Sequence, residues 1–106
     1  MDINDIEIGR IVKVKYNFGF RTGIIIIGAI REIDEKFINL CPAFEIFDNN
    51  CKTFFGSIKV FREYCESLLK ITEDDLFQYW KLIRINSNKR IIETVECLIF
   101  EEMEKL

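Results

Sequence analysis

The chain contains four cysteines but no histidine, the residue most often used as a general base. The cysteines stand at positions 41, 51, 65 and 97, so no pair has the spacing of about two to four residues that is typical of a zinc knuckle. A cysteine nucleophile usually needs a basic neighbour that lowers its pKa, and the sequence shows no such pair. We therefore expect four reduced, mostly buried thiols and no metal ion.

Carboxylates are plentiful, but none of them forms a recognisable acid and base couple. The densest group, Glu73-Asp74-Asp75, follows Thr72 and is explained by the start of a helix, where acids face the positive end of the helix dipole. Gly19, Gly23 and Gly28 are expected in a hairpin and a strand, without the following helix that a phosphate-binding loop needs. We therefore predict a protein that is not an enzyme, has no catalytic residue and uses no cofactor.

A hairpin near the N-terminus carries the strongest binding signal. Aromatic side chains at its tip stand beside cations, and in proteins that bind single-stranded nucleic acid such aromatics stack on bases while lysines hold phosphate. The same residues could anchor a protein contact, since tyrosine and arginine are enriched at interface hot spots. Alternatively, Phe18 and Phe20 cover the end of the fold. The candidate binding residues of this hairpin are Lys13, Lys15, Tyr16, Phe18, Phe20 and Arg21.

The run from Gly23 to Ile30 is the most apolar stretch of the chain, and we expect the other elements to pack around it. Its four consecutive isoleucines favour a strand over a helix. Because successive strand residues point to opposite faces, Ile24 and Ile26 face one side and the other two isoleucines face the opposite side, so both faces need cover. Gly23 and Gly28 bracket the run, and glycine inside a strand often marks a bulge or a sharp bend. We predict a central strand of a small, bent barrel or half-barrel.

The sequence on both sides of this strand predicts its neighbours. Apolar residues alternate with Lys13 and Lys15 from Val12 to Phe18, which indicates a half-buried strand with a basic outer face. A turn in which Gly19 takes positive φ joins it to the central strand. Further strands are expected over residues 37–41 and 52–55, with Pro42 as a break or bend after the first and Asp48-Asn49-Asn50 as a turn before the second.

Helical spacing of apolar residues begins after Gly56. Residues 58–61 fit a strand as well as a helix, so both stay open for residues 57–71, with a short strand running into a helical turn as one reading. Thr72 is expected to cap a first helix, and its buried stripe is predicted to be Leu76, Phe77, Trp80 and Ile83. A last helix should follow Asn86-Ser87-Asn88, and its acidic C-terminal turn either frays or meets a basic partner. The candidate interface residues on its apolar face are Ile92, Val95, Ile99 and Met103.

Size and composition indicate a single domain of 106 residues, with residues 9–61 as the β-barrel part and residues 62–106 mainly helical. No apolar run approaches the length of about 18 residues that a membrane helix needs. The acidic N-terminus lacks the order of a secretory signal, so we expect a cytoplasmic protein. A net charge of −3 argues against non-specific nucleic-acid binding. Isoleucine is abundant and alanine scarce, which suggests an AT-rich genome of a low-GC bacterium, an archaeon or one of their viruses.

From residue 9 to about residue 60, the order of these features resembles the Sm-like small β-barrel, which is similar to other SH3-like barrels. The residues that carry the resemblance are Gly9, Val12 and Val14, Gly23, Gly28-Ala29-Ile30, Asp34 and Asn39-Leu40, while Phe55-Gly56 stands where the family carries an Arg-Gly pair. The resemblance implies a ring-forming barrel that binds RNA, with Asp34 and Asn39 near the base pocket.

We therefore predict an α+β fold, in which a small, strongly bent antiparallel β-barrel or half-barrel is followed by two C-terminal helices. Our first hypothesis is a non-catalytic adaptor or inhibitor that acts through protein–protein contacts as a homo-oligomer and, on composition alone, could belong to a virus or mobile element. The alternative is an Sm-like protein that binds RNA or a nucleotide through the basic aromatic hairpin. The sequence leaves open whether the last helix packs on its own barrel or on a neighbour's.

Overall fold

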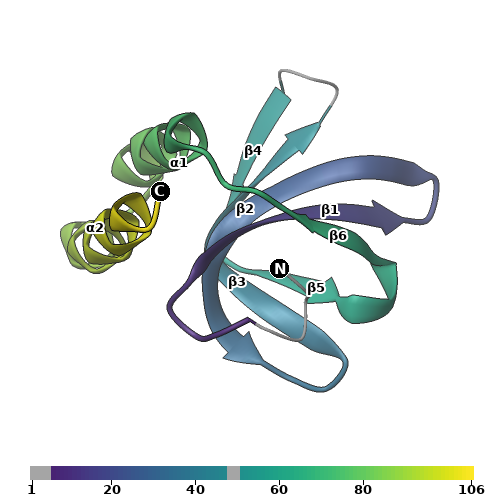
Figure 1. Ribbon diagram of the computed structural model, residues 1–106. Helices are drawn as coiled ribbons and strands as arrows, with labels where there is room; N and C mark the ends of the chain where they lie inside the picture. The colour runs from purple at the N-terminus through teal and green to yellow at the C-terminus, as the bar shows by residue number, and fades with distance from the viewer. Residues whose placement is uncertain (1–5, 48–50) are drawn as a thin grey trace.

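The computed structural model describes residues 6–47 and 51–106 as an open, bent antiparallel sheet with two helices on its outer face (Figure 1). The sheet order is β4-β3-β2-β1-β6, and β5 pairs with β3 off this path. The predicted fold class is confirmed in its half-barrel form, because the sheet does not close. The strands are β1 (Ile11–Phe18), β2 (Arg21–Ile33), β3 (Phe37–Phe47), β4 (Cys51–Phe55), β5 (Ile58–Phe61) and β6 (Cys65–Leu69); the helices are α1 (Glu73–Asn86) and α2 (Lys89–Glu104).

The isoleucine run forms the centre of the sheet, as predicted. β2 pairs with β1 on one side and β3 on the other, so Val14 lies opposite Ile26 and Ile27 lies opposite Phe44. Gly19 in the β1–β2 turn has a φ of 62°, a conformation that glycine adopts without steric cost. The turn predicted at Asp48-Asn49-Asn50 lies outside the described residues.

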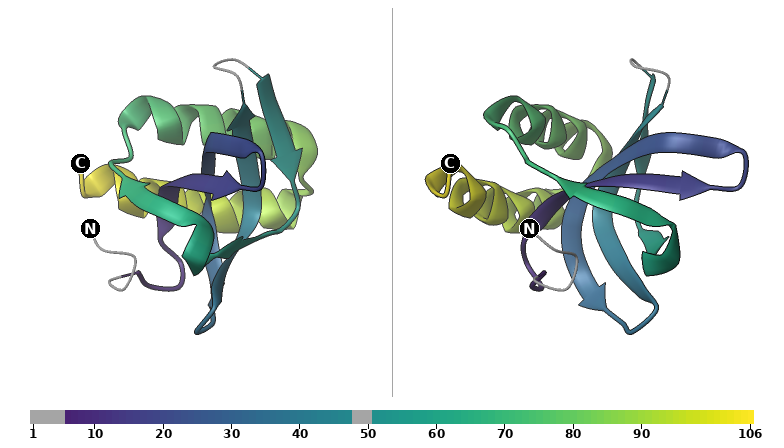
Figure 2. Two further views of the ribbon diagram at one scale, coloured as in Figure 1. Left: turned by 90° about the vertical axis from the view of Figure 1, so that its right-hand side faces the viewer. Right: turned by 45° about the vertical axis from the view of Figure 1, so that its right-hand side comes forward.

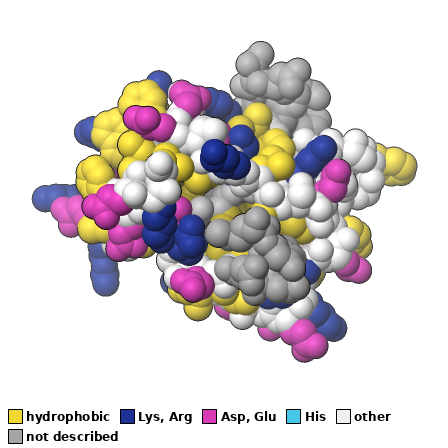
Figure 3. All heavy atoms as spheres, in the orientation of Figure 1, with side chains coloured by type: hydrophobic (Ala, Val, Ile, Leu, Met, Phe, Trp, Pro, Cys, Tyr) yellow, Lys and Arg dark blue, Asp and Glu magenta, His cyan; other side chains and the backbone are white. Residues whose placement is uncertain are grey.

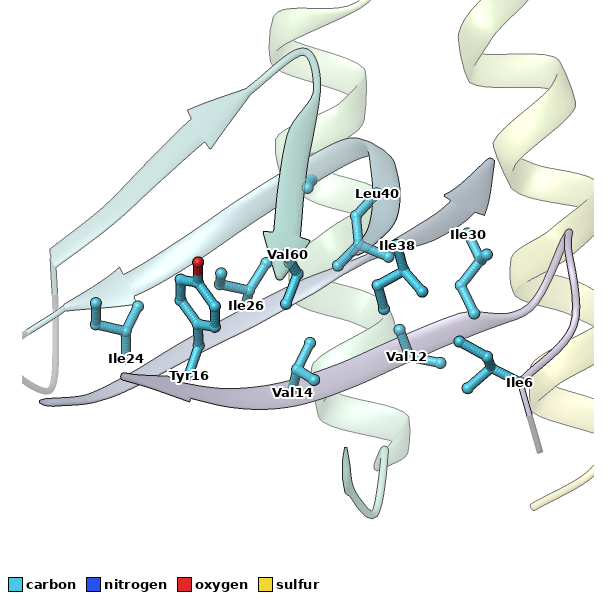
Figure 4. Packing of buried hydrophobic residues seen from close by; sticks show 11 residues of the cluster. Ile6, Val12, Val14, Tyr16, Ile24, Ile26, Ile30, Ile38, Leu40 and Val60 are labelled. Atoms are coloured by element: carbon cyan, nitrogen blue, oxygen red, sulfur yellow. The ribbon is translucent and has the colours of Figure 1, made fainter. Parts of the chain in front are cut away.

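One face of the bent sheet encloses an inner core. Alternate residues of β1 and β2 point into it and meet side chains from β3 and β5, as Figure 4 shows. The outer face of the sheet carries a second core, which the two helices close. Both faces of β2 are therefore covered, as its unbroken apolar sequence requires. The inner core contains Ile6, Val12, Val14, Tyr16, Ile24, Ile26, Ile30, Ile38, Leu40, Ala43 and Val60.

The bend of the sheet is centred on Gly28. The β2–β3 register shifts there, because Gly28 pairs with Ala43 whereas Ile30 pairs with Leu40. Ala29 thus lies opposite two residues of β3, which is the geometry of a β-bulge. Pro42 is one of these two residues, so it accompanies a bend and does not end the strand.

Of the readings left open for residues 57–71, a short strand that runs into a helical turn is found at residues 58–64, whereas the helical spacing does not hold for residues 65–69. β5 is followed by a single 3-10 turn at Arg62–Tyr64 and then by β6, which pairs with β1. The strand-rich part of the chain thus extends to Leu69, and the boundary at residue 61 is one strand too early. A run this short fits both the helical and the strand periodicity, and the pairing of Leu69 with Lys13 shows that it is a strand.

The two helices begin where their capping residues predict. The Thr72 hydroxyl accepts a hydrogen bond from the Asp75 N–H, the Asp75 carboxylate accepts one from the Thr72 N–H, and Asn88 caps α2. Leu76 and Ile83 of the predicted stripe are buried, but Phe77 is exposed and Tyr79, outside that stripe, is buried. The outer core contains Ile11, Ile27, Ala29, Phe44, Leu76, Tyr79, Ile83, Val95 and Ile99, so α2 packs on its own sheet.

The acidic end of α2 finds its basic partner inside the same chain. Glu102 is buried, and its Oε1 accepts a hydrogen bond from Arg10 Nε at 2.5 Å. The Ile11 N–H lies 3.4 Å from the same oxygen. This charge pair holds the C-terminal turn of α2 against the start of β1. A buried carboxylate needs such a partner, because an unpaired buried charge is unfavourable.

Candidate functional site

The basic hairpin predicted to bind phosphate is neutralised within the chain. Lys13 Nζ lies 3.2 Å from the Asp75 carboxylate, Lys15 Nζ lies 3.6 Å from Glu66, and Arg21 pairs with Glu45. The lysines on the outer face of β1 thus already have carboxylate partners. Each cation would have to exchange an existing carboxylate for a phosphate, which reduces any gain from binding nucleic acid.

The aromatic residues of this hairpin divide between the inner core and the surface. Tyr16 is buried, and Phe18 packs against both Tyr16 and Tyr64, with ring centroids 6.3 and 5.3 Å away. Phe20 contacts solvent over its whole surface, at 107% relative exposure. Phe18 therefore partly covers the end of the fold, whereas Phe20 does not.

Asp34 and Asn39 lie at the opposite end of β2 from the hairpin tip (Figure 1). The Asp34 carboxylate accepts a hydrogen bond from the Lys36 N–H at 3.0 Å, and Asn39 Oδ1 accepts one from the Ser57 hydroxyl at 2.7 Å. The structure therefore gives both residues local roles and does not bring them together with the hairpin cations.

The predicted interface on α2 is largely inside the protein. Val95 and Ile99 are 3% and 7% exposed and belong to the outer core, and Ile92 is half-buried against it. Only Met103, at 37% exposure, lies at the surface. The two central residues of the predicted interface are thus used to hold α2 on its own sheet.

A groove between the exposed sides of α1 and α2 is the strongest candidate site. It has a cavity volume of about 760 Å³, and its floor is formed by the buried Leu76 and Ile99. Large apolar side chains form its walls, including Phe77 at 52% exposure and Phe100 at 65%. We call this site the helix-pair groove, and its lining residues are Glu73, Asp74, Leu76, Phe77, Trp80, Glu96, Ile99, Phe100 and Met103.

The two walls of the helix-pair groove have the same order of residue types. α1 presents Glu73, Phe77 and Trp80, and α2 presents Glu96, Phe100 and Met103, each at positions i, i+4 and i+7. Residues at these spacings lie along one face of a helix. This pattern, in particular Phe100 outside the predicted stripe of α2, is the signal that could have revealed the groove in the sequence.

Acidic residues and no cations line the helix-pair groove, and the space-filling view shows hydrophobic, acidic and basic side chains intermixed over the helices (Figure 3). Glu96 Oε1 accepts a hydrogen bond from Trp80 Nε1 at 3.2 Å, and the Trp80 ring stacks on Phe77 with centroids 5.9 Å apart. Two cations, Lys81 and Arg84, lie over Phe77 and Trp80 but do not line the groove.

Other kinds of site have little support among the described residues. No group of three or more histidine, cysteine, aspartate or glutamate side chains within residues 6–47 and 51–106 could hold a metal ion. Burial raises the pKa of the Cys65 thiol, which keeps it protonated and weakly nucleophilic at neutral pH. Neither α1 nor α2 is long and apolar enough to cross a membrane.

The open, bent sheet with β2 at its centre belongs to the class of Sm-like folds. Over 61% of its length the chain is similar to a heptameric archaeal Sm protein, with a TM-score of 0.50, 29% identity and 90% of that chain covered. It is similar to the P. aerophilum SmAP1 heptamer with the same score and identity, over 82% of that chain. The resemblance predicted from the sequence is therefore confirmed as an Sm-like fold over part of the chain.

A chain of the NatC complex bound to CoA shares the fold as well, with a TM-score of 0.51 and 19% identity over 74% of this chain and 97% of that one. No family model matches this sequence, and no curated protein matches it. The Sm neighbours, which are heptamers, support a small protein of the binding or adaptor type.

Proposed function

We propose that this protein is a non-catalytic adaptor or inhibitor that acts by binding another protein through the helix-pair groove. The observation that carries the proposal is the exposure of Phe77, Phe100 and Met103 along one groove. Exposed apolar groups that lie together, rimmed by polar residues, are typical of protein-binding surfaces. Aromatic residues and methionine are also the types enriched at such interfaces.

The state of the other candidate groups supports binding over catalysis. The protonated Cys65 thiol has no histidine to activate it, since the chain contains none. The hairpin cations Lys13, Lys15 and Arg21 already have carboxylate partners. Both facts favour a surface that works by apolar contact.

A photo-crosslinking experiment tests the proposal. We expect the substitution of Phe100 by p-benzoylphenylalanine to give a discrete covalent adduct with one protein when cells that make the variant are irradiated, because this side chain is exposed in the groove. The adduct should disappear when Phe77 is replaced by aspartate in the same chain. It is read by denaturing gel and mass spectrometry.

The same photoreactive residue at Ile85 serves as the matched control, because this side chain is 77% exposed on α1 but does not line the groove. Equal adducts from positions 85 and 100 would mean that the contact is unspecific. The absence of any protein adduct from position 100 would contradict the proposal.

The second candidate function is RNA or nucleotide binding by an oligomer. It is favoured by the 29% identity to Sm proteins that are heptamers and by the aromatic hairpin tip, where Phe20 is fully exposed. The edges β4 and β6 of the open sheet could pair with other copies of the chain.

Native mass spectrometry of the protein purified at low salt distinguishes this candidate from the first. If the second candidate is correct, we expect a ring-sized oligomer that carries the extra mass of nucleotides, and replacing Phe20 by serine should remove that mass at unchanged stability. An oligomer without nucleotide would support assembly but contradict RNA binding. A bare monomer would contradict both assembly and RNA binding.

A further inference from the structure

We infer that the occupant of the helix-pair groove is a cationic amphipathic helix of a partner protein. This inference rests on the proposed function and specifies the class of partner. The groove runs between two antiparallel helices, and a third helix that lies along it would bury the exposed wall residues Phe77 and Phe100. An amphipathic helix in an apolar groove is a common mode of peptide recognition.

The positions of the acidic residues define the charge of this partner. Glu73 and Asp74 lie at the first turn of α1, and Glu96 is held beside Trp80 by their hydrogen bond. From Glu73 to Trp80 the helix rises about 10 Å, at about 1.5 Å per residue. Carboxylates therefore stand at both ends of the apolar walls, and no cation is among the lining residues, although Lys81 and Arg84 lie over the Phe77 and Trp80 rings.

The geometry predicts the sequence pattern of the partner. Side chains that reach both walls must come from one face of its helix, so apolar residues are expected at i, i+3 or i+4, and i+7. Two basic residues, each lysine or arginine, are expected about two helical turns apart, one on each side of these apolar residues. They would then lie opposite Glu73 and Glu96. A partner with acids at these positions would bury like charges together, which is unfavourable.

Two synthetic helical peptides of about 18 residues, a length at which isolated helices form, test this inference on the full chain. Both carry leucine at the same helical face, and the remaining positions are lysine in one peptide and glutamate in the other. Trp80 is the single tryptophan of the chain and lines the groove, so its fluorescence reports occupancy directly. We expect the lysine peptide to bind at least tenfold more tightly than the glutamate peptide.

Two sets of variants localise the interaction. Phe77→Ala with Phe100→Ala should lower the affinity for the lysine peptide at least tenfold, whereas Phe20→Ala, at the distant hairpin tip, should leave that affinity unchanged (Figure 2). Glu73→Gln, Asp74→Gln and Glu96→Gln together should remove the preference for lysine but keep the leucine contacts. Glutamine at position 96 keeps an oxygen that can accept the Trp80 Nε1 hydrogen bond.

The outcomes separate this inference from the proposed function. Equal binding of both peptides, or binding of neither, overturns the inference, and the proposed function then stands or falls by the protein adduct at position 100. If Trp80 fluorescence changes with protein concentration alone, and sedimentation shows dimers that the Phe77→Ala, Phe100→Ala chain lacks, the occupant is a second copy. That result also overturns the inference.

Discussion

Replacing Tyr79 by phenylalanine is expected to lower the free energy of unfolding by about 2–4 kcal/mol, because two buried backbone groups lose their partner. The Tyr79 hydroxyl accepts a hydrogen bond from the Ala29 N–H at 3.2 Å and donates one to the Pro42 carbonyl at 2.6 Å. Both groups belong to the bulge between β2 and β3, where the ladder is interrupted. The hydroxyl thus completes the hydrogen bonding of the sheet from α1.

Urea unfolding at neutral pH measures this change, and Tyr64→Phe is the matched control. The Tyr64 ring packs against Phe18 at the surface, so we expect its phenylalanine variant to stay within about 0.5 kcal/mol of the parent. Burial raises the pKa of the Tyr79 hydroxyl, so it remains a donor throughout the accessible pH range. Equal effects of the two substitutions would contradict the role given to Tyr79.

Replacing Gly28 by alanine is expected to cost about 1–3 kcal/mol, because the added methyl group has no space in a closely packed core. A Cβ at this position would lie 2.8 Å from Ala43 Cβ, 2.9 Å from Leu40 Cβ and 3.1 Å from the Pro42 carbonyl oxygen. All three belong to β3, so the two strands would have to separate at the bulge.

Gly56→Ala is the control for this substitution, since a Cβ there would meet nothing within 4 Å. We expect its free energy of unfolding to stay within about 0.5 kcal/mol of the parent's or to exceed it slightly. Thermal or urea unfolding of both variants gives the comparison. A Gly28→Ala protein as stable as the parent would mean that the bend does not depend on close approach of the strands.

Several elements follow directly from the sequence. The alternation from Val12 to Phe18 and the isoleucine run predicted β1 and β2 with the correct faces, because successive residues of a strand point to opposite faces. Thr72 and the break at Asn86-Ser87-Asn88 predicted both helix starts, since a cap is a contact between residues three apart. A glycine was predicted to mark a bend at Gly23 or Gly28, and the structure places a bulge at Gly28.

The errors share one cause, which is that the deciding contacts join residues distant in the chain. β6 is a strand because it pairs with β1, and its own sequence fits a helix as well. Phe77 is exposed because α1 turns Tyr79 towards Ala29, 50 residues away, and one helix cannot bury both sides. The phase of an amphipathic stripe is thus set by the surface on which the helix packs.

The candidate site shows the same division. The sequence by itself determined which residues are aromatic, cationic and acidic, and the elements that carry them, because these depend on residue type and local spacing. Only the tertiary structure decided which of them are available for binding. It paired Lys13 with Asp75 and Arg10 with Glu102, 62 and 92 residues away, and it left Phe100 exposed beside Phe77. Such pairings follow from the packing of the helices on the outer face of the sheet, which local sequence patterns do not encode.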